Sequence, residues 1–354
     1  MKSPIIKISL CLVCSISVVV VLFAISREKT HKDNGFYRLF PPHPVTRAKA
    51  IDLKFNSYYF AGNDDDVVYL SNTTAPLHLL SVRLPDLDTT HIQLTVANGK
   101  NLKFRRNTKV QILPPYFYIT DGVTPRLLRG TLGEWHAQPF MYDSAFFSTA
   151  IPIGPKSFVM RSISSKTKSY VLGKETAEYP YFKLVPGLLE KQIDGIFCTD
   201  GMLEYNQDIS KLIYLYYYRN QYIVMDSTLN LVYRENTIDT NTIAKIKTAE
   251  ISSKNSNTMA APPFLVNGKM ATYENKLLVM SNLMAKNESR KIFTEASVID
   301  VYNLKNREYE LSFYIYPYKD HKLSNFIITD KYFMALHDNY LVIYDNHLNL
   351  FNKK

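Results

Sequence analysis

The chain has 354 residues, enough for one large domain or two ordinary ones, and its hydrophobic content of 46% is sufficient for a sizeable core. Its 26 tyrosines and 13% aromatic content are typical of sheets with half-buried side chains. The net charge is +10, but the basic residues are scattered along the sequence, whereas a nucleic-acid groove needs them clustered. The composition therefore argues against a nucleic-acid partner.

Residues 8–25 form an almost continuous apolar segment near the amino terminus. As a helix this segment spans about 27 Å, which is just enough to cross the hydrocarbon core of a bilayer. The alternative is a signal peptide cleaved after Ser26, because Ala24 and Ser26 are small residues at the spacing that a signal peptidase selects. We favour an uncleaved anchor within residues 1–26, since the apolar run is long for a signal peptide. A lone N-terminal segment of this kind directs export, so we expect the rest of the chain outside the cytoplasm, in the periplasm or at the cell surface.

A spacer follows the apolar segment. Residues 27–45 contain three prolines and several charges, a composition typical of irregular structure. The main domain is expected at residues 46–354. Its only cysteine is Cys198, which excludes a disulfide within the domain.

Residues 211–235 show the pattern that the rest of the domain repeats. Three short runs rich in β-branched and aromatic residues (212–218, 222–225 and 229–233) are separated by polar turns, which predicts three consecutive antiparallel strands. Similar units recur, and their third strands are marked by Leu79, Leu127, Tyr170, Tyr222, Val298 and Leu341, at intervals of 48, 43, 52, 76 and 43 residues. A four-stranded propeller blade needs roughly 40–50 residues. We therefore predict an all-β, six-bladed β-propeller of four-stranded antiparallel blades; a pair of β-sandwiches is the rival, but it would not need such regular spacing.

Several elements of this propeller can be placed in the sequence. The fourth unit is expected to begin with a strand at residues 195–198 and the fifth with a strand at residues 264–266. The long interval is assigned to an insertion at residues 237–257, either a loop or a short helix, and residues 183–192 to a possible helical turn. The last unit shows only three strands, whereas residues 50–55 alternate apolar and polar side chains. We expect this N-terminal strand to complete the sixth blade and close the ring.

With this blade pattern, residues 50–349 resemble the bacterial six-bladed propellers called TolB-like. The resemblance rests on strands that end in Asp-Gly, at residues 118–122 and 197–201. It implies a fold and no activity, because propellers host many functions. In both Asp-Gly pairs we expect the glycine to supply the positive φ of a turn.

Motifs with specific chemistry are scarce. The sequence contains no His or Cys spacing typical of a metal site, no Gly-x-Ser-x-Gly and no glycine-rich phosphate loop, so we predict neither a metal nor a cofactor. The acidic residues 64–66 have the oxygen ligands that Ca²⁺ prefers, but a solvated turn is expected there. Trp135, His136 and Arg129 are the candidate binding residues, on a loop predicted between the second and third blades. Strand alternation favours a core position for the tyrosines at 214–218 and 222 over a stacking surface.

We therefore expect a membrane-anchored, extracytoplasmic propeller that binds a protein or peptide partner and catalyses no reaction. The alternative is a hydrolase or lyase with a site in the central channel, perhaps dependent on Ca²⁺, and a third candidate is a subunit of a redox enzyme whose partner carries the cofactor. An enzyme should gather Asp, Glu, His or Asn side chains from different blades at the channel mouth. A binding disc should present an apolar or aromatic patch on one face.

Overall fold

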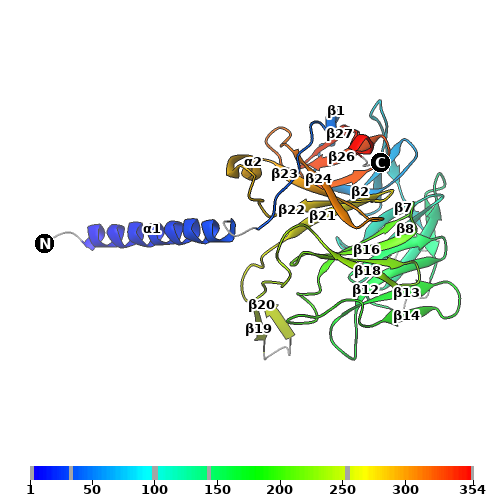
Figure 1. The fold of residues 1–354 in the computed structure, drawn as a ribbon. Helices are drawn as coiled ribbons and strands as arrows, with labels where there is room; N and C mark the ends of the chain where they lie inside the picture. Colours follow the sequence, from blue (N-terminus) through cyan, green and yellow to red (C-terminus); the bar gives the residue numbers. More distant parts are fainter. Residues whose placement is uncertain (1–3, 32–34, 98–102, 142–144, 252–255, 352–354) are drawn as a thin grey trace.

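The protein is a disc of β-strands with a long helix projecting from it (Figure 1). This computed structural model describes residues 4–31, 35–97, 103–141, 145–251 and 256–351. Six sheets of four or five strands form the disc, in addition to one two-stranded hairpin. The chain is an all-β, six-bladed propeller of largely antiparallel four-stranded blades, as the sequence predicts.

The four successive strands of each blade follow one another from the inside of the disc outward, except that the sixth blade takes its fourth strand, β1, from the N-terminal part of the chain; blade two carries β6 as an additional outermost strand. Blade one comprises β2 (Tyr58–Asp64), β3 (Val67–Asn72), β4 (His78–Arg83) and β5 (Asp88–Gln93). Blade two comprises β7 (Lys109–Leu113), β8 (Tyr116–Asp121), β9 (Arg126–Thr131) and β10 (His136–Pro139), with β6 (Thr95–Val96) beside β10. Blade three comprises β11 (Thr149–Gly154), β12 (Ser157–Ile163), β13 (Tyr170–Thr176) and β14 (Phe182–Val185). Blade four comprises β15 (Gly201–Asn206), β16 (Lys211–Tyr216), β17 (Gln221–Asp226) and β18 (Leu231–Asn236). Blade five comprises β21 (Asn267–Tyr273), β22 (Lys276–Ser281), β23 (Ser297–Asn303) and β24 (Glu308–Ile315). Blade six comprises β25 (Asn325–Ile328), β26 (Tyr332–His337), β27 (Tyr340–Asn346) and β1 (Val45–Asp52).

The core lies between the blades and follows from strand alternation. In β16, Tyr214 and Tyr216 pack against blade three, while Ile213 and Leu215 pack against blade five. All four side chains are fully buried, because a middle strand of a blade has a neighbouring blade on each face. The tyrosines of this segment therefore form core and no stacking surface, with the exception of the half-buried Tyr217.

The sixth blade joins the two halves of the chain. β1 pairs antiparallel with β27, from Val45 opposite Asn346 to Asp52 opposite Tyr340. Figure 1 shows the blue β1 beside the red end of the chain. This pairing gives β27 a partner on its outer side, so that β27 is not an exposed sheet edge.

The segment between α1 (Pro4–His31) and β1 is attached to blade five. Phe36 is buried beside Val266 and Leu283, and the Arg38 guanidinium is bonded to Asp300 of β23 and to Glu288. The segment predicted as a spacer thus includes the last residues of α1 and these two buried side chains.

The two ends of the disc differ in which strand connections they carry. At the hairpin end, the inner strands turn into the second strands and, in blades one to five, the third strands turn into the fourth. At the connection end, the inner strands begin, and the chain passes from blade to blade and from second to third strands. The connection end carries the hairpin of β19 (Thr248–Ile251) and β20 (Ser256–Met259), the short helix α2 (Arg290–Glu295) and the segment that leads to α1 (Figure 1).

Several local predictions need correction. The predicted strand at 195–198 is a turn whose backbone N–H groups at Ile196 and Phe197 bond to Asp194, and the inner strand is β15 instead. The strand predicted at residues 264–266 is absent, because these residues precede the inner strand β21. Residues 183–192, predicted as a helical turn, contain the end of β14 and no helix. The insertion at 237–257, predicted as a loop or short helix, contributes to the β19–β20 hairpin. Gly122 and Gly201 do not have a positive φ. A Cβ on either would lie 1.9 Å from the carbonyl oxygen of Phe147 or 2.4 Å from that of Leu215, so close approach of the backbone requires glycine there.

Counting only the residues that the structure describes, no helix has the length and apolar character needed to span a membrane.

Candidate functional site

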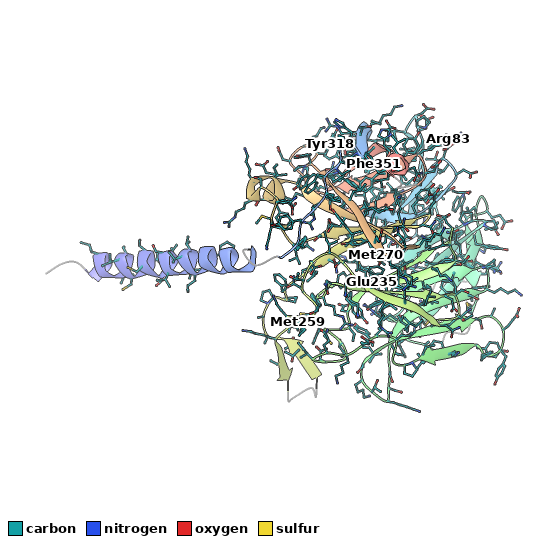
Figure 2. The ribbon with its side chains drawn as sticks, in the orientation of Figure 1. Arg83, Glu235, Met259, Met270, Tyr318 and Phe351 are labelled. Atoms are coloured by element: carbon teal, nitrogen blue, oxygen red, sulfur yellow. The ribbon has the colours of Figure 1, made fainter. Side chains whose placement is uncertain are left out.

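A central channel runs through the disc, as expected of a propeller. Its volume is about 560 Å³, and the inner strands of all six blades line it. Each inner strand contacts the inner strands of its two neighbours, which closes the ring around the channel. Figure 2 labels Met270 of the inner strand β21 near the middle of the disc, Met259 on the side of α1 and Arg83 on the far side.

Glu204 of β15 places a carboxyl group inside this channel. The residue is partly exposed along the channel, but protein surrounds its carboxyl group, and this burial raises its pKa to about 7. Its Oε1 accepts hydrogen bonds from the backbone N–H of Thr272, at 3.3 Å, and from the Thr272 hydroxyl, at 3.5 Å. Both bonds are long, so they offset only part of the desolvation. In the described part of the chain, no cationic side chain pairs with Glu204.

More carboxylates line the hairpin end of the channel. Asp64 and Asp65 come from the first turn of blade one, and Asp208 comes from that of blade four. The Asp208 carboxylate accepts a bond of 2.7 Å from the backbone N–H of Glu274, which joins the turns of blades four and five. These acidic side chains from separate blades make this mouth of the channel attractive to cations.

The connection end of the channel has the opposite charge. Lys109 begins the inner strand of blade two and Lys269 lies near the start of the inner strand of blade five, across the channel. Burial and the charge of Lys269 lower the pKa of Lys109. The ammonium of Lys109 lies 4.2 Å from the centre of the Tyr59 ring, a cation–π contact that holds it in place.

The candidate residues from the sequence lie elsewhere. Trp135 stands in the turn between β9 and β10, within blade two, and its ring packs on Tyr69 and Phe117 between blades one and two. His136 begins the outer strand β10, where its Nδ1 lies 2.8 Å from the Thr95 hydroxyl.

Arg129 of the same blade points toward blade three. Its guanidinium lies 3.9 Å from the centre of the Phe140 ring and donates a bond of 2.7 Å to the carbonyl of Pro155. The predicted loop between blades is therefore a turn and an outer strand. Trp135 and His136 are neighbours there, while the described contacts of Arg129 lead to another blade interface.

The acidic run at 64–66 forms the end of β2 and the turn that follows it. Within the described ranges, no three His, Cys, Asp or Glu side chains are grouped closely enough to hold a metal ion. Asp66 instead forms an exposed ion pair with Lys331 of blade six, at 3.1 Å.

Sequence reasoning missed Glu204, because the inner strand that carries it was not recognised. β15 reads Gly-Met-Leu-Glu-Tyr-Asn, without a β-branched residue, and its four central positions are only half buried. A carboxylate in the middle of the first strand of a blade is the signal that would have identified it.

Comparisons with known proteins bear on the fold alone. No protein-family model and no curated protein matches the sequence. A solved structure of a member of the DUF4221 family from Bacteroides vulgatus aligns with a TM-score of 0.51 at 13% identity, over 85% of this chain and 97% of that chain. The β-propeller domain of Cps50 (Swd1) from Myceliophteria thermophila aligns with a TM-score of 0.45 at 9% identity, over 85% and 99% of the two chains. A Bacteroides thetaiotaomicron protein of unknown function aligns with a TM-score of 0.46 at 10% identity, over 88% and 75%. The first similarity supports the six-bladed propeller, while membership of the TolB-like group in particular stays a prediction.

Proposed function

We propose that the protein is a binding module that holds a positively charged group of a protein or peptide partner in its central channel. The observation that carries this proposal is the carboxyl group of Glu204, which lies inside the channel without a cationic partner among the described residues. A buried carboxylate is costly unless it is paired. A bound ammonium or guanidinium group would supply the missing charge.

The charges around Glu204 support entry of the partner from the hairpin end. Asp64, Asp65 and Asp208 line that mouth, so an approaching cation is attracted before it reaches Glu204. At the other end of the channel, Lys109 and Lys269 repel a cation. A lysine or arginine side chain on an extended segment has the length and the charge to fit this arrangement.

Titration calorimetry of the full chain in detergent tests the proposal, with a trilysine peptide as the probe and a triglutamate peptide as the negative control. We expect trilysine to bind, and Glu204→Gln to weaken it at least about tenfold because the paired charge is lost. Bound cation favours the ionised carboxyl, so binding near pH 7 should also release protons, which is measurable as a dependence of the heat on the buffer.

Glu235→Gln is the matched control. Glu235 lies on the outer strand β18 of the same blade and is not among the residues that line the channel. The Glu235→Gln variant should bind trilysine with the affinity of the wild type. Equal affinity of wild type and Glu204→Gln, or equal binding of both peptides, would overturn the proposal.

A catalytic role in the same channel is the second candidate, and two observations favour it. A carboxyl group with a pKa of about 7 can act as a general acid or base at neutral pH. Polar side chains from several blades also meet at the hairpin mouth, as expected of a channel enzyme. Turnover of a chromogenic ester or glycoside that Glu204→Gln abolishes, while trilysine binding by the wild type is absent, would establish this role.

We also propose that α1 attaches the disc to a membrane through residues 8–25, with the disc outside the cytoplasm. The large apolar side chains described between Ile6 and Phe23 are all more than half exposed on α1, which supports a lipid environment for them. Carbonate extraction of cell membranes should leave the full chain in the pellet, and protease added to spheroplasts, which exposes periplasmic and surface domains alike, should digest the disc. N-terminal sequencing that begins after Ser26 would instead show a cleaved signal peptide.

A further inference from the structure

The connection end of the disc carries a surplus of positive charge. Its exposed basic side chains come from loops all around the ring: Lys54, Lys103, Arg105, Arg106, Lys166, Lys168, Lys191, Lys245, Lys247, Lys286, Arg290, Lys291, Lys319 and Lys322. The exposed carboxylates described in the same loops and strand ends are Asp52, Glu190, Glu295 and Asp320, and the first two form ion pairs with Lys54 and Arg234.

The hairpin end has the opposite balance. Its exposed carboxylates are Asp65, Asp66, Asp86, Asp88, Glu134, Glu178, Asp208, Glu308 and Asp330, and its exposed basic side chains are fewer: Arg83, Lys156, Lys183, Lys305, Arg307 and Lys331, together with Lys49, whose ammonium bonds to the carbonyl of Pro85. The charge that appears scattered in the sequence is therefore separated along the axis of the disc. Successive turns of the chain alternate between the two ends, so basic and acidic turns that are mixed along the sequence lie at opposite ends of the disc.

Exposed apolar side chains accompany the lysines at the connection end. Between 41% and 67% of their surface is exposed, and they come from the loops around blades one to five: Phe55, Val123, Phe146, Ile163, Ile193, Ile243 and Leu265. One such residue on a surface is ordinary, but a ring of them among basic residues at one end is typical of a surface that meets lipid headgroups.

The chain also leaves the disc toward α1 from this end. Phe36 is buried next to Val266, which precedes β21, and next to Leu283, which follows β22, so the segment before it starts at the connection end. Figure 1 shows α1 on the same side of the disc as α2 and the β19–β20 hairpin. The basic, apolar end of the disc and the apolar helix α1 therefore lie on one side of the molecule.

We propose that the connection end of the disc lies on an anionic lipid surface. Its lysines and arginines would contact the headgroups, and side chains such as Ile163 and Ile243 would enter the interfacial layer. The hairpin end, with the acidic mouth of the channel, then faces the solvent and any partner. The inference goes beyond the proposed function and uses the proposed anchor only to bring the disc close to lipid.

Two observations favour lipid over nucleic acid as the occupant. The basic residues circle the end of the disc and do not follow a groove, whereas a nucleic-acid strand needs a continuous basic track. The apolar side chains between them are mostly aliphatic, which suits an acyl boundary better than stacking on bases.

Hydrogen exchange of the full chain in nanodiscs tests the proposal, with a zwitterionic lipid compared with a mixture that contains anionic lipid. We expect residues 163–168, 243–247 and 286–291 to exchange at least about threefold more slowly on anionic lipid, because the surface shields these loops. The hairpin-end residues 64–66 and 206–210 should exchange at the same rate on both lipids. About 0.5 M salt should remove the difference, since it screens the attraction.

A matched pair of charge reversals sharpens the test. Lys166→Glu, Lys168→Glu and Lys247→Glu together should abolish the slowing, whereas Lys156→Glu, Lys305→Glu and Lys331→Glu at the hairpin end change the net charge equally and should preserve it. Equal exchange on both lipids in the wild type would overturn the proposal. Slower exchange of these loops on adding single-stranded DNA, with none on anionic lipid, would also overturn it.

Flotation with vesicles separates this proposal from the membrane anchor. A full chain that floats with zwitterionic vesicles but shows no lipid-dependent exchange supports the anchor and overturns the lipid-facing end. A full chain that floats only with anionic vesicles, and is released by salt, overturns the anchor and supports the lipid-facing end.

Discussion

The guanidinium of Arg38 meets the carboxylate of Asp300 at two points, with Nε 2.7 Å from Oδ1 and Nη2 2.9 Å from Oδ2. Both residues are buried, and Glu288 contacts the same guanidinium from a loop of blade five. Paired in this way, Arg38 holds the segment that follows α1 against the disc. Such a bidentate pair contributes more to stability than a single hydrogen bond, because two parallel bonds fix the planar guanidinium.

Asp300→Asn should therefore destabilise the protein by about 3 kcal/mol, since it leaves a buried guanidinium incompletely paired. Urea unfolding measures the loss. Glu178→Gln breaks the ion pair between Glu178 and Lys156, whose side chains are 75% and 65% exposed, and should leave the urea midpoint nearly unchanged because solvent screens the pair. Similar losses in the two variants would contradict the role given to Arg38.

Removing β1 should destabilise the ring far more than removing the segment before it. A chain of residues 43–354 keeps the pairing of β1 with β27, whereas a chain of residues 57–354 exposes the edge of β27. We expect the shorter chain to melt at least about 10 °C lower or to aggregate, because an unpaired edge strand is both unstable and adhesive. Thermal melts with size-exclusion chromatography make the comparison, and equal melting temperatures would show that the sixth blade does not need β1.

Glu204 should make stability depend on pH. Its pKa is raised from 4.5 to about 7 by burial, so between these values the folded state holds a proton that the unfolded state has lost. Stability from this group is present below about pH 4.5 and is lost as the pH rises through about 7. Glu204→Gln should remove this loss and stabilise the protein by about 2 kcal/mol at pH 8. Urea unfolding at several pH values measures how the free energy of unfolding depends on pH. The control Glu235→Gln should show the same pH dependence as the wild type. The same pH dependence in Glu204→Gln would refute the prediction.

Two glycines should respond differently to the same substitution. Gly122→Ala places a Cβ 1.9 Å from the carbonyl oxygen of Phe147 and should cost about 2–3 kcal/mol. Gly154→Ala meets no atom within 4 Å and should be nearly neutral or slightly stabilising. Equal unfolding midpoints in denaturant for the two variants would disprove the close approach at Gly122.

The sequence predicted the middle strands of the blades better than the inner ones. Leu79, Leu127, Tyr170, Tyr222, Val298 and Leu341 all lie in third strands, as expected. A middle strand is buried on both faces and is rich in β-branched and aromatic residues, which gives it a clear pattern. The inner strands β15 and β21 face a partly polar channel, so their residues lack that pattern, and both were misplaced.

The candidate site was hard to predict for the same reason. Glu204 and Thr272 are 68 residues apart and belong to different blades, so only the closed ring brings them together. Trp135 drew attention as the sole tryptophan, but its turn places the ring between Tyr69 and Phe117. Trp135 is therefore a core residue, and residue type alone does not indicate which side chains face the channel.

Because β1 pairs with β27, the sixth blade can be completed only late in translation. Among the described strands of the disc, β1 leaves the ribosome first, and its partner β27, at residues 340–346, leaves last. At roughly 5–20 residues per second, the nascent chain takes on the order of tens of seconds to reach β27. During that interval β1 has no native neighbour, so the growing protein carries an unsatisfied strand until translation of the sixth blade is complete.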